Sequence, residues 1–222
     1  MSSVAQRIEQ IYQQLPSNVR LIAVTKQVSI AAMREAYAAG VRDFGESRIQ
    51  EALPKQEQLR DLSDLRWHFL GHIQTNKAKK VIENFQWIHS VDSLKLALRL
   101  NQLAAQQSVE LRSCLQVKIL PDPQKYGWTV PELQVNLPKL DQCNYLGIQG
   151  LMTILPLGLS ESQALSAFSA TRKLAHNIEQ QCLANIAMQQ LSMGMSADYR
   201  LATQAGATMI RLGRILFGDR PQ

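Results

Sequence analysis

The sequence alternates about eight times between a short apolar run and a longer segment with helical periodicity. The first apolar run is Leu21–Val24, and the helical segment after it begins at the capping residue Ser29 and stops at Gly40. Strands that alternate with helices form parallel sheets, because each helix crosses back over a face of the sheet. About eight such units favour a closed barrel of parallel strands, and an open doubly wound sheet is the alternative.

The other units follow the same alternation. Further strands are expected at residues 41–45, 67–71, 87–89, 115–120, 145–152, 188–191 and 208–212. Helices are expected over 74–82, over 93–107 and after a capping box at Ser160, whereas residues 121–128 are expected to form the longest irregular loop. A capping box at Ser3 begins an N-terminal amphipathic helix that Pro16 ends. The expected fold class is therefore α/β, a single (β/α)8 TIM barrel over residues 1–222 with an extra N-terminal helix.

Composition narrows the class of protein. Hydrophobic residues make up 45% of the chain and supply a large core, while the charged share of 19% argues against disorder. The formal net charge of +6 attracts phosphate groups, either on a cofactor or on nucleic acid. The three cysteines are widely spaced and form no C-x-x-C motif, which suits a reducing cytoplasm. The N-terminus has no apolar core run, and no stretch approaches the ~18 apolar residues of a membrane span, so neither export nor a membrane is expected.

Lys26 is the first candidate functional residue, because it directly follows the apolar run Leu21–Val24. Active sites of such barrels lie at the carboxyl ends of the strands. A lysine held there loses hydration, so the pKa of its amine falls and it becomes a nucleophile toward an aldehyde. From position alone, a lysine whose amine simply reaches solvent at a strand end is the favoured interpretation.

Two glycine-containing turns are candidates for a phosphate site. Ser192–Asp198 follows the seventh expected strand and Gly213-Arg214 follows the eighth, which is where this fold usually binds phosphate. Small residues let backbone N–H groups approach phosphate oxygens, and a helix that begins near Ser196 or Arg214 adds its positive end. A single turn of this kind is common in proteins and would not indicate a ligand, but two at the expected places favour a phosphate site.

Metal and nucleic-acid sites are less well supported. His68 and His72 have the i, i+4 spacing of some zinc sites, but they straddle a strand end and no nearby residue completes a ligand set, so no metal is expected. Lys77, Lys79 and Lys80 form a basic cluster on an expected helix. Such clusters are usually solvated, and with 6% aromatic residues the chain lacks the aromatic interleaving of a nucleic-acid surface.

Seven motifs together resemble the YggS/PROSC family of pyridoxal-phosphate homeostasis proteins, whose cyanobacterial members are of the PipY type. They extend from about Val24 to Arg220 and read AVTK, FGES-x-x-QE, WHFLGHIQTNK, IHSVDS, GLMTI, LSMGMSADY and IRLG-x-x-LFG-x-R. The resemblance implies a barrel similar to the N-terminal domain of alanine racemase, of fold type III among proteins that bind pyridoxal 5′-phosphate (PLP). It also implies that the protein holds PLP covalently.

The resemblance implies a role for particular residues. Lys26 would carry PLP as a Schiff base, and Arg211 would face its pyridine nitrogen. The family usually has asparagine where this chain has Ser47, and its Asn–Glu pair after the fifth strand is replaced by Lys118 and Asp122. The other implied cofactor-binding residues hold the phosphate (Ser196, Gly213 and Arg214), lie beside the ring (Ser47 and Met195) or line the mouth of the barrel (His72, Asn76 and Thr153).

The resemblance further implies a carrier rather than an enzyme. A charged Arg211 at the pyridine nitrogen disfavours protonation there, which weakens the ring as an electron sink. The chain ends at Gln222, without the domain that supplies the second base in alanine racemase. The expected protein is a cytoplasmic monomer that holds PLP for vitamin B6 homeostasis and amino-acid/keto-acid balance. PLP-dependent apoenzymes would be its recipients, and neither membrane nor nucleic acid a partner.

Two alternatives remain. The first is a PLP-dependent enzyme, such as a slow amino-acid racemase or lyase, which turnover dependent on Lys26 would reveal. The second is a regulatory or nucleic-acid-binding module that uses the basic cluster, which a steep salt dependence of binding would reveal.

Overall fold

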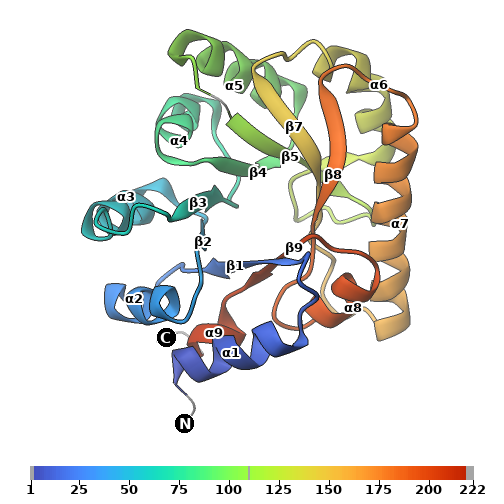
Figure 1. Ribbon diagram of the computed structural model, residues 1–222. Coiled ribbons are helices and arrows are strands. Elements are labelled where there is room, and N and C mark those ends of the chain that lie inside the picture. The colour runs from blue at the N-terminus through green and yellow to red at the C-terminus, as the bar shows by residue number, and fades with distance from the viewer. Residues whose placement is uncertain (1–2, 110, 219–222) are drawn as a thin grey trace.

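Eight parallel strands close into a ring in the computed structural model, which describes residues 3–109 and 111–218 (Figure 1). Neighbouring strands follow the chain order around the ring, and the pairing of β4 with β5 completes it. The strands of the ring are β1 (Arg20–Val24), β2 (Asp43–Glu46), β3 (Arg66–Phe69), β4 (Trp87–Val91), β5 (Leu111–Lys118), β7 (Leu146–Met152), β8 (Ile186–Ser192) and β9 (Met209–Leu212).

A helix follows each strand of this ring and packs on its outside (Figure 1). The helix α1 (Val4–Gln14) precedes the barrel and lies beside α9, which brings the first and last elements together. The expected (β/α)8 barrel with an extra N-terminal helix is thereby confirmed. The helices of the ring are α2 (Ile30–Ala38), α3 (Ile49–Gln58), α4 (Ala78–Asn84), α5 (Leu94–Gln107), α6 (Val130–Leu140), α7 (Glu161–Glu179), α8 (Tyr199–Gln204) and α9 (Arg214–Phe217).

Local sequence signals explain where several helices begin. The Ser3 hydroxyl accepts a hydrogen bond from the Gln6 backbone N–H, and the Gln6 side chain accepts one from the Ser3 backbone N–H. The same reciprocal pair at Ser160 and Gln163 begins α7. Each such cap satisfies backbone donors that the first turn leaves free and is worth about 1 kcal/mol.

The helix α6 was not expected from the sequence. Pro131 lies in its first turn, where a backbone N–H is not needed, and Thr129 forms a capping box with Glu132. A short strand, β6 (Trp128–Thr129), leads into it and pairs with the end of β5. The apolar face of α6 is buried at i, i+4 and i+7 spacing, through Leu133, Leu137 and Leu140.

Some expected boundaries were wrong by a few residues. The strand β5 begins at Leu111 rather than Leu115, and Leu111 is already buried. The helix expected from Gln74 begins instead as a 3-10 turn, η1 (Thr75–Lys77), before α4. The helix expected near Ser196 begins three residues later, at Tyr199.

The core has two parts. The larger cluster fills the space between the ring of strands and the surrounding helices. The smaller one lies inside the barrel and comprises Ile22, Trp87, Cys114, Met152 and Met209. Polar side chains share this interior, and they turn out to be connected to one another.

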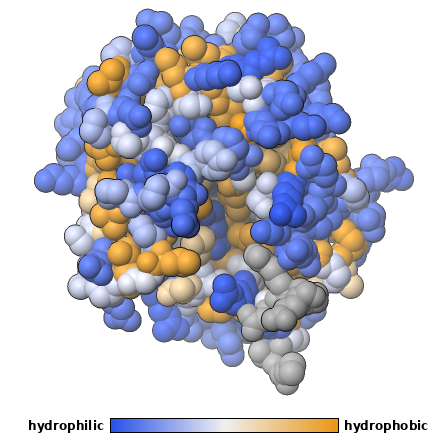
Figure 2. Space-filling model, turned by 180° about the vertical axis from the view of Figure 1, so that it is seen from behind, coloured by the Kyte–Doolittle hydropathy of each residue, from blue (hydrophilic) through white to orange (hydrophobic). Residues whose placement is uncertain are grey.

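The face of the molecule shown in Figure 2 is mostly polar. On the face shown in Figure 2, apolar groups are small and separated by hydrophilic side chains. Among the described residues, no helix combines the length and the apolar character that crossing a membrane requires.

Candidate functional site at the carboxyl-terminal rim of the barrel

Lys26 lies just beyond the end of β1 in a cavity of about 250 Å³. The turn after β9 forms the facing wall, through Gly213, Arg214 and Phe217. The chain leaves Lys26 through Gln27, whose φ of 59° lies in the left-handed region that costs a non-glycine residue about 1 kcal/mol. The structure therefore brings together the lysine and one of the two turns that the sequence singled out.

A buried ion pair holds the backbone next to Lys26. The Lys55 ammonium of α3 donates to the Thr25 carbonyl at 2.7 Å and to the Glu46 carboxylate at 2.7 Å. The Thr25 hydroxyl donates to the same carboxylate oxygen at 2.7 Å, and the Glu46 side chain is fully buried. Breaking a buried pair of this kind typically costs 3–5 kcal/mol, so the cluster fixes the strand end that presents Lys26. Sequence reasoning missed it, because the pairing depends on how α3 packs against the barrel.

The two candidate phosphate turns meet each other. The Ile215 backbone N–H donates to the Ser196 hydroxyl at 3.4 Å, so the turn after β8 touches the start of α9. Gly194 has a φ of +93°, and a Cβ at this position would lie 2.6 Å from the Cβ of Ala202. The Met195 backbone N–H is held by the Asp198 carboxylate at 2.6 Å. Glycine is therefore required at 194, and the turn is held in one conformation.

Arg211 lies on β9 and its side chain is buried. Its guanidinium donates to the Ser192 hydroxyl at 2.8 Å and to the Thr153 carbonyl at 2.8 Å. Burial lowers the pKa of the Arg211 guanidinium to about 10, so the group remains charged at neutral pH. The Thr153 hydroxyl donates to the Val117 carbonyl at 2.9 Å. Arg211 and Thr153 are thus in contact, as their joint assignment to one site requires.

The polar contacts of Arg211 continue down the barrel interior. The Ser192 hydroxyl lies 2.8 Å from Nδ1 of His89, and Nε2 of His89 lies 2.9 Å from Nδ1 of His68. Nε2 of His68 lies 2.8 Å from an oxygen of the Asp43 carboxylate. Arg66 donates to both oxygens of this carboxylate, at 3.0 and 2.8 Å. His68, considered earlier for its spacing from His72, therefore belongs to a buried hydrogen-bond chain.

The ionisation states in this chain follow from burial. Desolvation lowers the pKa of His68, which the Asp43 hydrogen bond only partly offsets. Desolvation, together with the charges of neighbouring groups, lowers the pKa of His89 well below its usual value. Burial raises the pKa of Asp43, but hydrogen bonds and charges from His68 and Arg66 outweigh it, so its net pKa is lowered. At neutral pH both histidines are neutral and Asp43 is ionised.

These states predict a stability that is lost in mild acid. In the unfolded chain His68 and His89 bind protons below about pH 6.5, whereas in the folded chain their lowered pKa values keep them neutral to lower pH. The free energy of unfolding therefore falls as the pH drops below about 6.5. We expect a slope of up to about 1.4 kcal/mol per pH unit for each histidine. Asp43 contributes only at lower pH, below its unfolded pKa of about 3.9. Urea unfolding between pH 5 and 8 measures the slope, and a profile that is flat across this range contradicts the neutral assignment.

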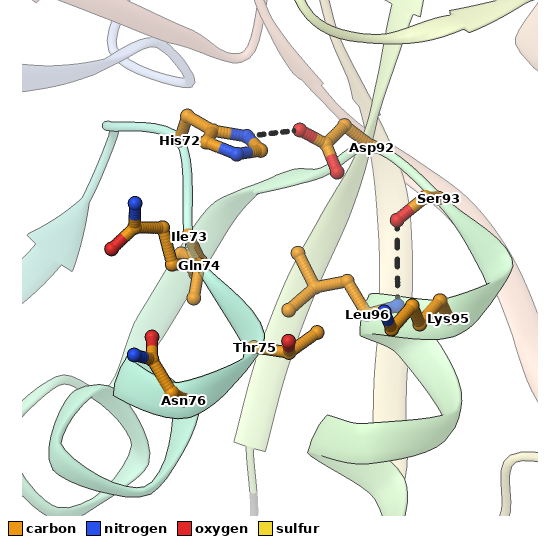
Figure 3. A pocket seen from close by; sticks show the side chains of 9 residues that line it. All are labelled: His72, Ile73, Gln74, Thr75, Asn76, Asp92, Ser93, Lys95 and Leu96. Atoms are coloured by element: carbon orange, nitrogen blue, oxygen red, sulfur yellow. Dashed lines mark hydrogen bonds and ion pairs between the residues drawn. The ribbon is translucent and has the colours of Figure 1, made fainter.

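A second group of predicted residues surrounds another cavity, of about 440 Å³ (Figure 3). His72 and Asn76 both line it, and Nδ1 of His72 lies 2.7 Å from the Asp92 carboxylate. The His72 ring also stacks on Tyr126, with ring centroids 3.6 Å apart, which ties the loop after β5 to the loop after β3. Ser47 lines an adjoining cavity with His72. Lys26 does not line either of these cavities, whose walls come from the loops after β2, β3 and β4 and from α5. The joint role of Ser47, His72 and Asn76 with Lys26 therefore stays a prediction.

No metal centre emerges from the histidines. His68 and His72 have separate partners, Asp43 and Asp92. Within residues 3–109 and 111–218, no group of three or more His, Cys, Asp or Glu side chains is arranged to hold a metal ion.

The chain is similar in sequence to a known protein family and to several proteins of one name. The family model described as "Alanine racemase, N-terminal domain" matches residues 1–221. A pyridoxal phosphate homeostasis protein of Synechocystis sp. is 54% identical over 206 residues, covering 93% of this chain and 94% of the relative. A protein of the same name from Pseudomonas aeruginosa is 41% identical, with 99% and 94% covered.

Solved structures agree in fold. PipY of Synechococcus elongatus with PLP bound has a TM-score of 0.93 and 49% identity, and covers 97% of this chain and 100% of its own. An alanine racemase of Clostridium difficile has a TM-score of 0.78 at 16% identity, covering 99% of this chain and 57% of its own, which shows a shared fold alone.

Proposed function

The chain belongs to the pyridoxal phosphate homeostasis proteins, a group built on the alanine racemase N-terminal domain, and from this we propose that it is a PLP carrier that holds the cofactor as a Schiff base on Lys26. PLP binding by the 49% identical PipY supports the choice of ligand. The carrier would serve vitamin B6 homeostasis by passing PLP to PLP-dependent apoenzymes.

The cavity that Lys26 shares with the turn after β9 carries the proposal. The Lys26 ammonium has no hydrogen bond or ion pair within residues 3–109 and 111–218, and it shares its cavity with Gly213 and Arg214. The Ser196 hydroxyl accepts a hydrogen bond from the backbone of Ile215, the residue after Arg214, so the second turn lies next to the first. A free amine beside glycine turns that present backbone N–H groups suits a ligand with both an aldehyde and a phosphate.

Arg211 sets the chemical character of the site. When bound, PLP supplies an electrophilic aldehyde and a ring whose electron-withdrawing power depends on protonation of its nitrogen. Arg211 would face that nitrogen, and its permanent charge disfavours a proton there. The charge is well fixed, because Ser192 and Thr153 each accept a hydrogen bond from it. The site is therefore suited to holding PLP and poorly suited to stabilising a carbanion.

The carrier is proposed to be a cytoplasmic monomer. Its three cysteines are free thiols, with Cys114 and Cys143 buried and Cys182 exposed, which suits a reducing compartment.

The absence of catalysis is testable by exchange of the Cα hydrogen in deuterium oxide. With the PLP-loaded protein and a panel of amino acids, we expect no exchange at enzyme-like rates of ~1–10³ per second, because the ring is a poor electron sink. The loaded state is verified beforehand by the absorbance of bound PLP, and Lys26→Ala serves as the control. Fast exchange that disappears in Lys26→Ala would replace the carrier with a racemase or lyase.

A further inference from the structure

The buried chain from Arg211 to Asp43 has ends of opposite chemical type. An arginine guanidinium can only donate hydrogen bonds, and an ionised carboxylate can only accept them. Between these ends lie the Ser192 hydroxyl and two imidazoles, each of which both donates and accepts when neutral. Each successive heavy-atom distance is 2.8 or 2.9 Å, so every link is a hydrogen bond of ordinary length.

The ends determine the direction of every link. Since Asp43 can only accept, Nε2 of His68 carries a hydrogen and Nδ1 of the same neutral ring must accept. His89 therefore donates through Nε2 to His68, and its own Nδ1 accepts from the Ser192 hydroxyl. The Ser192 oxygen is then free to accept from Arg211, which is the only direction that an arginine allows. All four hydrogen bonds point from Arg211 toward Asp43, with both imidazoles in the Nε2–H form.

We propose that Ser192, His89 and His68 are positioning residues for Arg211, and that this one-directional chain, anchored on Asp43, keeps the PLP ring nitrogen unprotonated. The inference rests on the proposed PLP site and deepens it. His89 turns the Ser192 hydroxyl hydrogen away, so that the oxygen lone pairs face the guanidinium. Hydrogen bonds aligned in this way polarise one another inside a low-dielectric barrel.

Two arginines hold the carboxylate at the far end of the chain. Asp43 is held by Arg66 through two hydrogen bonds, and the Arg20 guanidinium lies 3.8 Å from it. These two arginines keep the carboxylate an acceptor. Trp87 stacks on His68, with the two ring centroids 5.9 Å apart. Asp43 is therefore held in place as the acceptor at the far end of the chain.

The direction of the chain is measurable without any ligand. Nitrogen-15 NMR of histidine-labelled protein distinguishes protonated from unprotonated ring nitrogens. For the wild-type apo protein at pH 7 we expect His68 and His89 to be neutral, with hydrogen on Nε2 and none on Nδ1. A hydrogen on Nδ1 of either ring overturns the proposed direction, even if PLP never binds.

The positioning role is tested in the PLP-loaded protein with ring-¹⁵N-labelled PLP. In the wild type we expect an unprotonated ring nitrogen, and in both variants a shift toward the protonated form, because Ser192→Ala removes the Ser192 acceptor of Arg211 and His89→Phe removes the group that orients that acceptor. The control His176→Gln changes an exposed histidine on α7 and is expected to leave the signal unchanged. A ring-nitrogen signal that is identical in the wild type, Ser192→Ala and His89→Phe overturns the proposal. Failure of the wild type to bind PLP instead overturns the carrier function, while the apo measurement still decides the chain direction.

Discussion

Replacing Lys26 with alanine is expected to abolish covalent PLP entirely while leaving the barrel folded. Reduction of the wild type with borohydride, followed by peptide mapping, will place the pyridoxyl group on Lys26. The Lys26 side chain makes no hydrogen bond or ion pair with the described residues, so its removal costs little stability, within about 0.5 kcal/mol. Circular dichroism and urea unfolding check that the variant retains the wild-type fold.

Lys80→Ala is a matched control, because Lys80 is an exposed lysine on α4 that has no proposed role in binding PLP. It is expected to retain full labelling. A pyridoxyl group on Lys77 or Lys118 would show that the site is misassigned, and an unfolded Lys26→Ala protein would show that Lys26 is a structural residue.

The second large effect concerns the phosphate. Pyridoxal, which lacks it, is expected to bind about 100-fold or more weakly than PLP. Each hydrogen bond to a charged group contributes about 1.5–3 kcal/mol, and tenfold in affinity corresponds to about 1.4 kcal/mol, so two lost contacts account for this factor. Equilibrium titration followed by absorbance measures both affinities, and equal values would remove the phosphate site from the proposal.

Ser196→Ala dissects the same site and is expected to weaken PLP about tenfold. Ser196 also accepts a hydrogen bond from the Ile215 backbone, so unfolding measurements accompany the titration. Ser169→Ala removes an exposed hydroxyl on α7 and is expected to change neither affinity nor stability. Unchanged PLP affinity in Ser196→Ala would place the phosphate elsewhere.

The fold was predictable because its signals are local. The alternation of apolar strands with capped helices, such as those begun by Ser29 and Ser160, depends on residues a few positions apart. The helix α6 was missed although Thr129 and Glu132 form a capping box and Leu133 begins a buried face. That signal was present in the sequence, but two prolines in the segment obscured it.

The candidate site was predictable only in part. Strand ends identify Lys26 and the two turns, because a parallel barrel gathers all carboxyl ends on one rim. The chain below Arg211 depends instead on closure of the ring. His89 and Ser192 are 103 positions apart in sequence, and no local pattern pairs them. The Glu46–Lys55 pair likewise arises from the packing of α3 on β1 and β2, which sequence spacing does not encode.

The direction of the buried chain limits how this barrel can acquire a stronger electron sink. A carboxylate at position 211 would accept a hydrogen from Ser192 rather than donate one. Ser192 would then need a hydrogen from Nδ1 of His89, while Nε2 of His68 still donates to Asp43. Keeping every link would require one of the two histidines to carry a hydrogen on both ring nitrogens, so a stronger electron sink would require a proton taken up deep in the barrel, and not only a new residue at its rim.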